Sequence, residues 1–141
     1  MPTTDDANTI TLPRDAAAIA AARAWVSETI RRRHALPREH VEAALVMVSE
    51  LVTNVMVHTE AAPRVVVSAD DDHVVVEVVD DDPAEPVVRE PDPTRVGGNG
   101  LRIVDSWAER WGVRRLERGK VVWFAIPVAP SAGAAPQVTR G

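Results

Sequence analysis

The chain has 141 residues, a formal net charge of -5 and no cysteine. Its length and its 45% hydrophobic content suit one globular domain. The acidic balance disfavours direct nucleic-acid binding, because phosphates need a basic surface, and the lack of cysteine excludes disulfides and zinc–thiolate sites. We find no apolar run of membrane-span length and no signal peptide in the polar N-terminus, so we expect a cytoplasmic protein with no membrane partner.

The spacing of apolar residues along the chain separates helices from strands. A period of 3.6 residues predicts helices, and valine-rich runs bounded by aspartate, glycine or proline predict strands. In chain order we expect a disordered lead at 1–8, a strand at 9–12, helices at 15–33 and 37–58, strands at 64–69 and 74–79, a long loop at 83–96, a helix at 101–111, strands at 113–116 and 121–126, and a disordered tail at 128–141. This order predicts an α+β two-layer sandwich over residues 9–127, with the helices on one face of a mixed, mostly antiparallel sheet.

The second predicted helix carries three polar residues on an otherwise apolar surface. Glu50, Asn54 and His58 recur every four residues, so they lie along one face. A helix that is apolar all round is normally buried, and buried polar side chains need partners. The pattern indicates either internal hydrogen bonds or a cleft in which these side chains meet a ligand, and we favour the cleft.

Glu50 and Asn54 are the candidate catalytic pair. The amide oxygen of Asn54 is a suitable ligand for Mg²⁺, which takes few protein ligands when it also binds substrate phosphates. Glu50, one helical turn away, could act as a general base on water or on an acceptor hydroxyl. The spacing equally allows a Glu50–Asn54 hydrogen bond in the core. For His58, at the helix end, the expected role is hydrogen bonding to free carbonyl groups.

Two later segments have the chemistry of a nucleotide site. Asp80 ends a strand, where its carboxylate can accept a hydrogen bond from an amino group such as that of adenine; a solvated turn of aspartates is the alternative. The Gly-Gly-Asn-Gly run at 97–100 opens a helix, where backbone amides and the helix dipole favour a phosphate. It is neither a P-loop nor a dinucleotide fingerprint, and a flexible hinge is the alternative.

Taken together, these segments resemble the GHKL (Bergerat-fold) ATPases, and within them the small single-domain anti-sigma-factor serine kinases. The resemblance covers about residues 9–127. It depends on Glu50-Leu51-Val52-Thr53-Asn54 with His58, on Asp80, on the loop at 83–96, on Gly98-Asn99-Gly100-Leu101-Arg102-Ile103-Val104, on Trp111-Gly112-Val113, and on Gly119-Lys120-Val121-Val122-Trp123-Phe124.

The resemblance implies the Bergerat ATP-binding fold, ATP and Mg²⁺ as cofactors, and a role for each matching residue. Asn54 would coordinate Mg²⁺, Glu50 would orient or deprotonate the acceptor hydroxyl, and Asp80 would hold the adenine amino group. The implied phosphate-binding turn consists of Gly98, Asn99, Gly100 and Leu101, and the loop at 83–96 would be the ATP lid. The implied partners are a sigma factor and an antagonist protein phosphorylated on serine, and pairing of two copies of the chain is a further expectation.

Other functions stay open. Three residues depart from the family pattern: Asp82 where a glycine or another small residue is usual, Val55 in place of alanine, and Val121 where threonine is common. These residues favour a partner-binding regulator of the same fold with weak or no ATP turnover. A sensor histidine kinase domain is disfavoured, because the helix expected in residues 16–33 has no histidine to accept a phosphoryl group.

Overall fold

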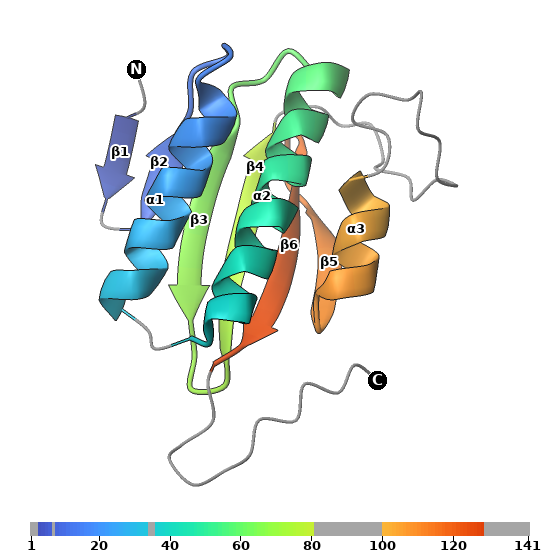
Figure 1. The fold of residues 1–141 in the computed structure, drawn as a ribbon. Coiled ribbons are helices and arrows are strands. Elements are labelled where there is room, and N and C mark those ends of the chain that lie inside the picture. Colours follow the sequence, from blue (N-terminus) through green and yellow to red (C-terminus); the bar gives the residue numbers. More distant parts are fainter. Residues whose placement is uncertain (1–2, 7, 34–35, 81–99, 129–141) are drawn as a thin grey trace, which may run out of the picture.

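The computed structural model describes residues 3–6, 8–33, 36–80 and 100–128. They form one six-stranded sheet in the order β1-β2-β3-β4-β6-β5, with three helices across one face (Figure 1). The elements are β1 (Thr3–Asp6), β2 (Thr9–Thr11), α1 (Ala18–Arg33), α2 (Arg38–His58), β3 (Arg64–Ala69), β4 (His73–Asp80), α3 (Gly100–Trp107), β5 (Arg110–Arg115) and β6 (Lys120–Pro127). The predicted α+β two-layer sandwich is confirmed. Every strand pairing among the described residues is antiparallel, so the sheet is not mixed.

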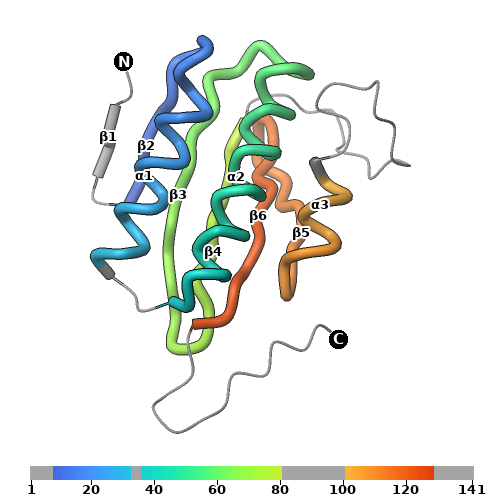
Figure 2. Tube along the Cα trace, in the orientation of Figure 1, coloured from blue at the N-terminus to red at the C-terminus, as the bar shows by residue number. Residues whose placement is uncertain are grey.

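The hydrophobic core lies between the helices and the sheet. The helices lie side by side, with α2 between α1 and α3, as Figure 2 also shows. Phe124 of β6, Met47 of α2 and Ile30 of α1 are completely buried. Because side chains alternate between the two faces of a strand, Val76 and Val78 of β4 point into this core while Val79 lies on the opposite face. This alternation also decides where the end residues of β4 and β6 point.

Most element boundaries are close to those predicted, and two differ. Residues 1–8 were expected to be disordered, but Thr3–Asp6 form an edge strand paired with β2. The last helix was expected to reach residue 111, but α3 ends at Trp107 and Trp111 belongs to β5, opposite Phe124 of β6. Strand pairing across β6 therefore prevails over the helical spacing of the apolar residues.

Gly112 follows directly on the helix predicted for residues 101–111, but it lies inside β5, where it makes room for an aromatic ring. It lies in β5 directly opposite Trp123 of β6. A Cβ atom at this position would come within 2.9 Å of Trp123 Cζ2, closer than such atoms pack. The Trp123 ring therefore lies against the bare backbone of Gly112, on the sheet face that carries no helix.

The composition of α2 reaches that of a membrane span, contrary to the sequence-based expectation. It has 21 residues and a mean hydropathy of 1.4 over its most apolar window. A core helix can have the same composition, and α2 buries the side chains that face the sheet, including Val48, Leu51 and Val52. Because 33% of that window is buried, the position of α2 over the sheet accounts for part of its apolar character.

Candidate functional site

Hydrogen bonds from Arg23 show which flank of α2 faces α1. Arg23 of α1 donates hydrogen bonds to the carbonyl oxygen of Leu45 (3.2 Å) and to Ser49 Oγ (3.0 Å). Asn54 follows Ser49 by five residues, which is about 140° around an α-helix. Asn54 therefore lies on the other flank of α2, toward α3 (Figure 1).

Asn54 carries an unpaired polar atom. Its side-chain oxygen Oδ1 is buried and has no hydrogen-bond partner. Within the described part of the chain no hydrogen bond joins Asn54 to Glu50, so the alternative of a closed core pair is not what the structure has. A buried acceptor without a donor is costly, and a cation would satisfy it. The site thus fits a hard cation such as Mg²⁺ at Asn54 Oδ1.

A cation here would have few protein ligands. Among the described residues, no group of three histidine, aspartate or glutamate side chains could hold a metal ion. Mg²⁺ commonly keeps several waters and takes one or two protein ligands together with substrate phosphates. The arrangement therefore suits a magnesium ion that arrives with a polyphosphate.

Glu50 and His58 flank Asn54 on the same helix but differ in their surroundings. Glu50 is partly exposed one turn before Asn54, which leaves its carboxylate accessible to a substrate hydroxyl. His58, the last residue of α2, is exposed. The helix-end role expected of His58 falls to other residues: Arg14 donates to the carbonyl oxygen of Met56 (3.1 Å), and Thr59 Oγ1 donates to that of Val55 (2.8 Å).

Asp80 is the buried last residue of β4, and it forms an ion pair. Its Oδ1 lies 3.3 Å from Nζ of Lys120, the first residue of β6, and the two residues are directly opposite in the strand register. Side-chain exposure is 8% for Lys120 and 4% for Asp80. The alternative of a solvated turn is thus wrong for Asp80. The sequence did not single out Lys120 as a partner of Asp80. Its spacing from Val122 could have indicated this position, because residues two apart in a strand point to the same face of the sheet.

The phosphate-binding turn is described only in part. Gly98 and Asn99 lie outside the described residues, as do Asp82 and the predicted lid at 83–96. Gly100 is the first residue of α3. Leu101 is 4% exposed and belongs to the hydrophobic core, so it anchors the first turn of α3. The start of α3 and the ends of α2 and β4 lie at the same end of the molecule (Figure 1).

Two of the three family departures lie away from the candidate site. Val55 packs in the core below α2, so crowding a nucleotide is not its role. Val121 pairs with Val79 on the sheet face opposite Asp80. The residue that approaches Asp80 is its neighbour Lys120.

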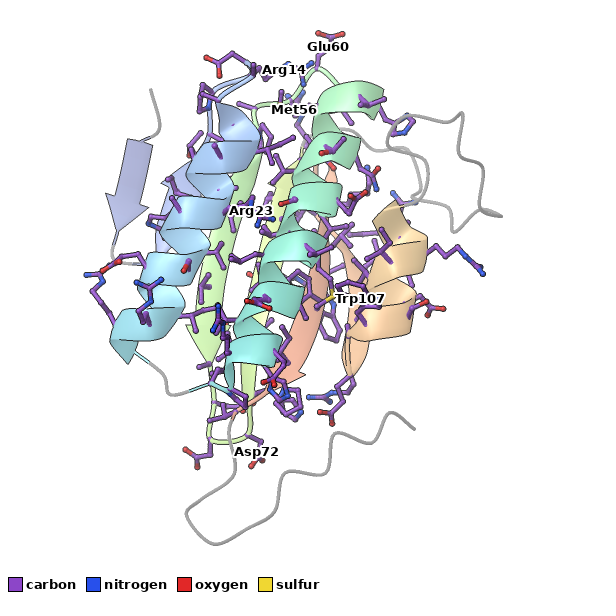
Figure 3. All side chains as sticks on the ribbon, in the orientation of Figure 1. Arg14, Arg23, Met56, Glu60, Asp72 and Trp107 are labelled. Atoms are coloured by element: carbon purple, nitrogen blue, oxygen red, sulfur yellow. The ribbon has the colours of Figure 1, made fainter. Side chains whose placement is uncertain are left out.

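Figure 3 shows which of its labelled side chains lie at each end of the sandwich. Arg14, Met56 and Glu60 lie at the end where α2 terminates, and Asp72 lies at the other end, in the β3–β4 turn. Asn54, Asp80 and Gly100 belong to the first of these ends, as their elements show. The polar groups of the candidate site are therefore gathered at one end of the fold.

Comparison with known proteins identifies the family. The sequence pattern of the histidine kinase-like ATPase domain matches residues 12–126. Among solved structures, the RsbU and RsbW domains of Rv1364c from Mycobacterium tuberculosis are similar, with a TM-score of 0.66 and 17% identity; the match covers 96% of this chain and 35% of that one. The histidine kinase domain of the E. coli osmosensor EnvZ matches with a TM-score of 0.47 and 18% identity, over 99% of each chain. Comparison with curated protein sequences found no significant match.

The chain belongs to the histidine kinase-like ATPase family. The family match covers both layers of the sandwich, from the residue after β2 to the next-to-last residue of β6. At 17% identity the similarity to the mycobacterial protein establishes the shared fold, and the chain corresponds to about a third of that protein.

Proposed function

We propose that this protein binds ATP with Mg²⁺ and is a cytoplasmic protein-serine kinase that regulates a sigma factor. The observation that carries the proposal is the buried, unpaired Oδ1 of Asn54 on the α3-facing flank of α2. The family match supports ATP as the ligand. The structural similarity to a protein with an RsbW domain supports a role in anti-sigma regulation, with a sigma factor and a serine-bearing antagonist as partners.

The proposed reaction transfers the γ-phosphoryl group of ATP to a serine hydroxyl. The serine oxygen bonds to the γ-phosphorus, the bond between that phosphorus and the β–γ bridging oxygen breaks, and ADP leaves. Glu50 accepts the hydroxyl proton, and Asn54 holds the metal ion. When bound, Mg²⁺ neutralises phosphate charge, and such reactions depend mainly on positioning and electrostatic stabilisation.

Calorimetric titration of ATP tests the binding half of the proposal. We expect binding in Mg²⁺ that is lost when EDTA replaces the metal, because Asn54 Oδ1 then meets no cation. No heat of binding in Mg²⁺, with the fold intact by circular dichroism, would contradict the proposal and favour a partner-binding regulator without a nucleotide.

The variant Glu50→Gln should separate ATP binding from phosphoryl transfer. Glu50→Gln keeps the size of the side chain but removes the base. We expect ATP affinity to be unchanged and transfer of label from γ-labelled ATP to an antagonist serine to fall at least about a hundredfold. Glu42→Gln, on the exposed surface of the same helix, is the matched control. Full transfer by Glu50→Gln would mean that the base is another residue.

A further inference from the structure

Strand β5 forms one of the two edges of the sheet, and among the described residues its outer side has no neighbouring strand (Figure 1). At the β5–β6 turn, the backbone N–H of Leu116 donates to the carbonyl oxygen of Gly119 (3.1 Å). In an antiparallel pair, alternate residues turn their backbone groups toward the neighbouring strand. Arg114 and Gly112 therefore bond to β6 as Leu116 does, and the backbone N–H and C=O of Val113 point to the outer side of the sheet.

The side chains at this edge are basic and apolar. Residues 110–118 contain four arginines and one glutamate, which gives them a net charge of +3 in a chain whose net charge is -5. Val113 and Leu116 are each 38% exposed, and they are two of the four large apolar side chains that are exposed in the described part of the chain. The β5 edge is thus a basic and apolar surface on an acidic protein.

The strand register assigns these side chains to the two faces of the sheet. Val113 is opposite Val122, whose side chain is in the core, so Val113 lies on the helical face. Arg114 is opposite Val121 on the helix-free face, where it forms an ion pair with Glu77 at 3.0 Å. The Arg114 side chain is 54% exposed, and a guanidinium group has five donors, so Arg114 can bind a second carboxylate.

Backbone geometry and charge together define what fits this edge. A second copy of β5 is disfavoured, because it would place arginines beside arginines. A nucleic acid would meet the positive charge but has no peptide groups to pair with those of Val113. An extended polypeptide segment with alternating apolar and acidic residues satisfies both requirements, with its apolar side chains beside Val113 and its carboxylates beside Arg114.

We propose that β5 binds an extended, acidic segment of a partner protein, which adds a strand to the edge of the sheet. Main-chain hydrogen bonds to Val113 supply affinity, and charge-assisted bonds from the arginines select an acidic partner. The inference goes beyond the proposed kinase activity, because strand addition at β5 requires neither ATP nor Mg²⁺.

The first test measures peptide binding to the full-length protein without nucleotide. The probe is a peptide of about eight residues, within the usual length of a strand, in which valine and glutamate alternate; its counterpart has lysine in place of glutamate. We expect the glutamate peptide to bind at least about tenfold more tightly, because one charge-assisted hydrogen bond contributes about that factor. We also expect it to slow hydrogen exchange of the Val113 amide, measured by NMR. Equal affinities, no binding of the glutamate peptide, or unchanged exchange at Val113 would overturn the inference.

Variants at position 113 distinguish strand addition from binding through side chains alone. Val113→Pro removes the outward N–H without removing a hydrogen bond to β6. We expect it to lower affinity for the glutamate peptide at least about tenfold, because main-chain bonds to the added strand are lost. The matched control Val113→Ala keeps the N–H, and its affinity should stay within about threefold of wild type. Full affinity in Val113→Pro would overturn the inference.

A charge variant decides the question even if Val113→Pro does not fold. Arg114→Gln removes a cation, and we expect it to reduce the preference for the glutamate peptide over the lysine peptide. The control is Arg64→Gln, because Arg64 is exposed on the same face but belongs to β3, which has a strand on each side. An unchanged preference in Arg114→Gln would overturn the inference. So would a single-stranded oligonucleotide that binds the wild-type protein when the glutamate peptide does not, since the basic segment would then contact nucleic acid.

Discussion

Asn54 shows how a single atom can point to a function. A buried amide oxygen without a donor lowers stability by about 1–3 kcal/mol, so it is rarely kept without a reason. Two polar residues nearby in sequence, Glu50 and Ser49, do not satisfy it, because a carboxylate accepts hydrogen bonds and the Ser49 hydroxyl donates to the carbonyl oxygen of Leu45 at 2.7 Å. The unpaired oxygen therefore supports the proposal that Asn54 is the ligand of a cation.

Replacing Asn54 should lower nucleotide affinity while raising the stability of the folded protein. We expect Asn54→Ala to lower ATP affinity in Mg²⁺ at least about tenfold, since even the loss of an outer-shell partner has that effect on metal affinity. We also expect the free energy of unfolding in urea to rise by about 1 kcal/mol, because the variant removes an unpaired buried acceptor and alanine favours helix.

Thr53→Ala is the control for Asn54→Ala. Thr53 is the preceding residue, and its hydroxyl bonds back to the carbonyl of Ser49 at 2.7 Å, within α2. This variant should leave nucleotide affinity unchanged. Equal ATP affinity in Asn54→Ala and wild type would exclude Asn54 as the metal ligand.

At the scale of elements, the β3–β4 hairpin is set by one aspartate. Asp70 Oδ1 accepts hydrogen bonds from the backbone amides of Asp72 (2.8 Å) and His73 (2.7 Å). These bonds, that of Asp72 first, hold the pKa of Asp70 below its ordinary value of 3.8. Because the folded protein favours the charged carboxylate, its contribution to stability is present above pH 3.8 and is lost as the pH falls through the lower folded pKa.

Thermal unfolding as a function of pH tests this turn. We expect wild type to have a higher Tm than Asp70→Asn above pH 3.8, and the difference to vanish at more acid pH, where Asp70 is protonated. The asparagine retains an acceptor oxygen but no titrating charge. Asp71→Asn, at an exposed position of the same turn, should behave as wild type. A difference in Tm that persists unchanged into acid would show that the charge of Asp70 does not matter.

At the scale of the whole molecule, both layers share one core, and β6 is central to it. Phe124 is completely buried and lies on the strand that pairs with both β4 and β5. We expect Phe124→Ala to lower the free energy of unfolding by about 3–5 kcal/mol, through lost burial and the cavity left behind. Urea unfolding followed by tryptophan fluorescence measures it.

Val113→Ala is the control for this core substitution. Val113 is 38% exposed on the neighbouring strand β5, and the variant should change the free energy of unfolding by no more than about 0.5 kcal/mol. A loss of the same small size in Phe124→Ala would mean that the two layers are not held together by a single core.

The sequence by itself determined the fold class, the order of the main elements and the polar residues on α2. These follow from local rules: helical spacing of apolar residues, valine-rich strands, and an aspartate turn. The glycine motif, Asp80 and the Glu50–Asn54 spacing also pointed correctly to the family, because the resemblance lies in short segments that can be recognised from sequence alone.

Only the tertiary structure decided which groups meet. The pairing of Lys120 with Asp80 depends on the register of strands that are 40 residues apart in sequence. The unpaired state of Asn54 depends on how α2 is rotated over the sheet, and the end of α3 at Trp107 depends on β5 pairing with β6. Local sequence patterns do not predict these contacts. Each depends on side-chain burial and strand pairing between segments that come together only when the chain folds.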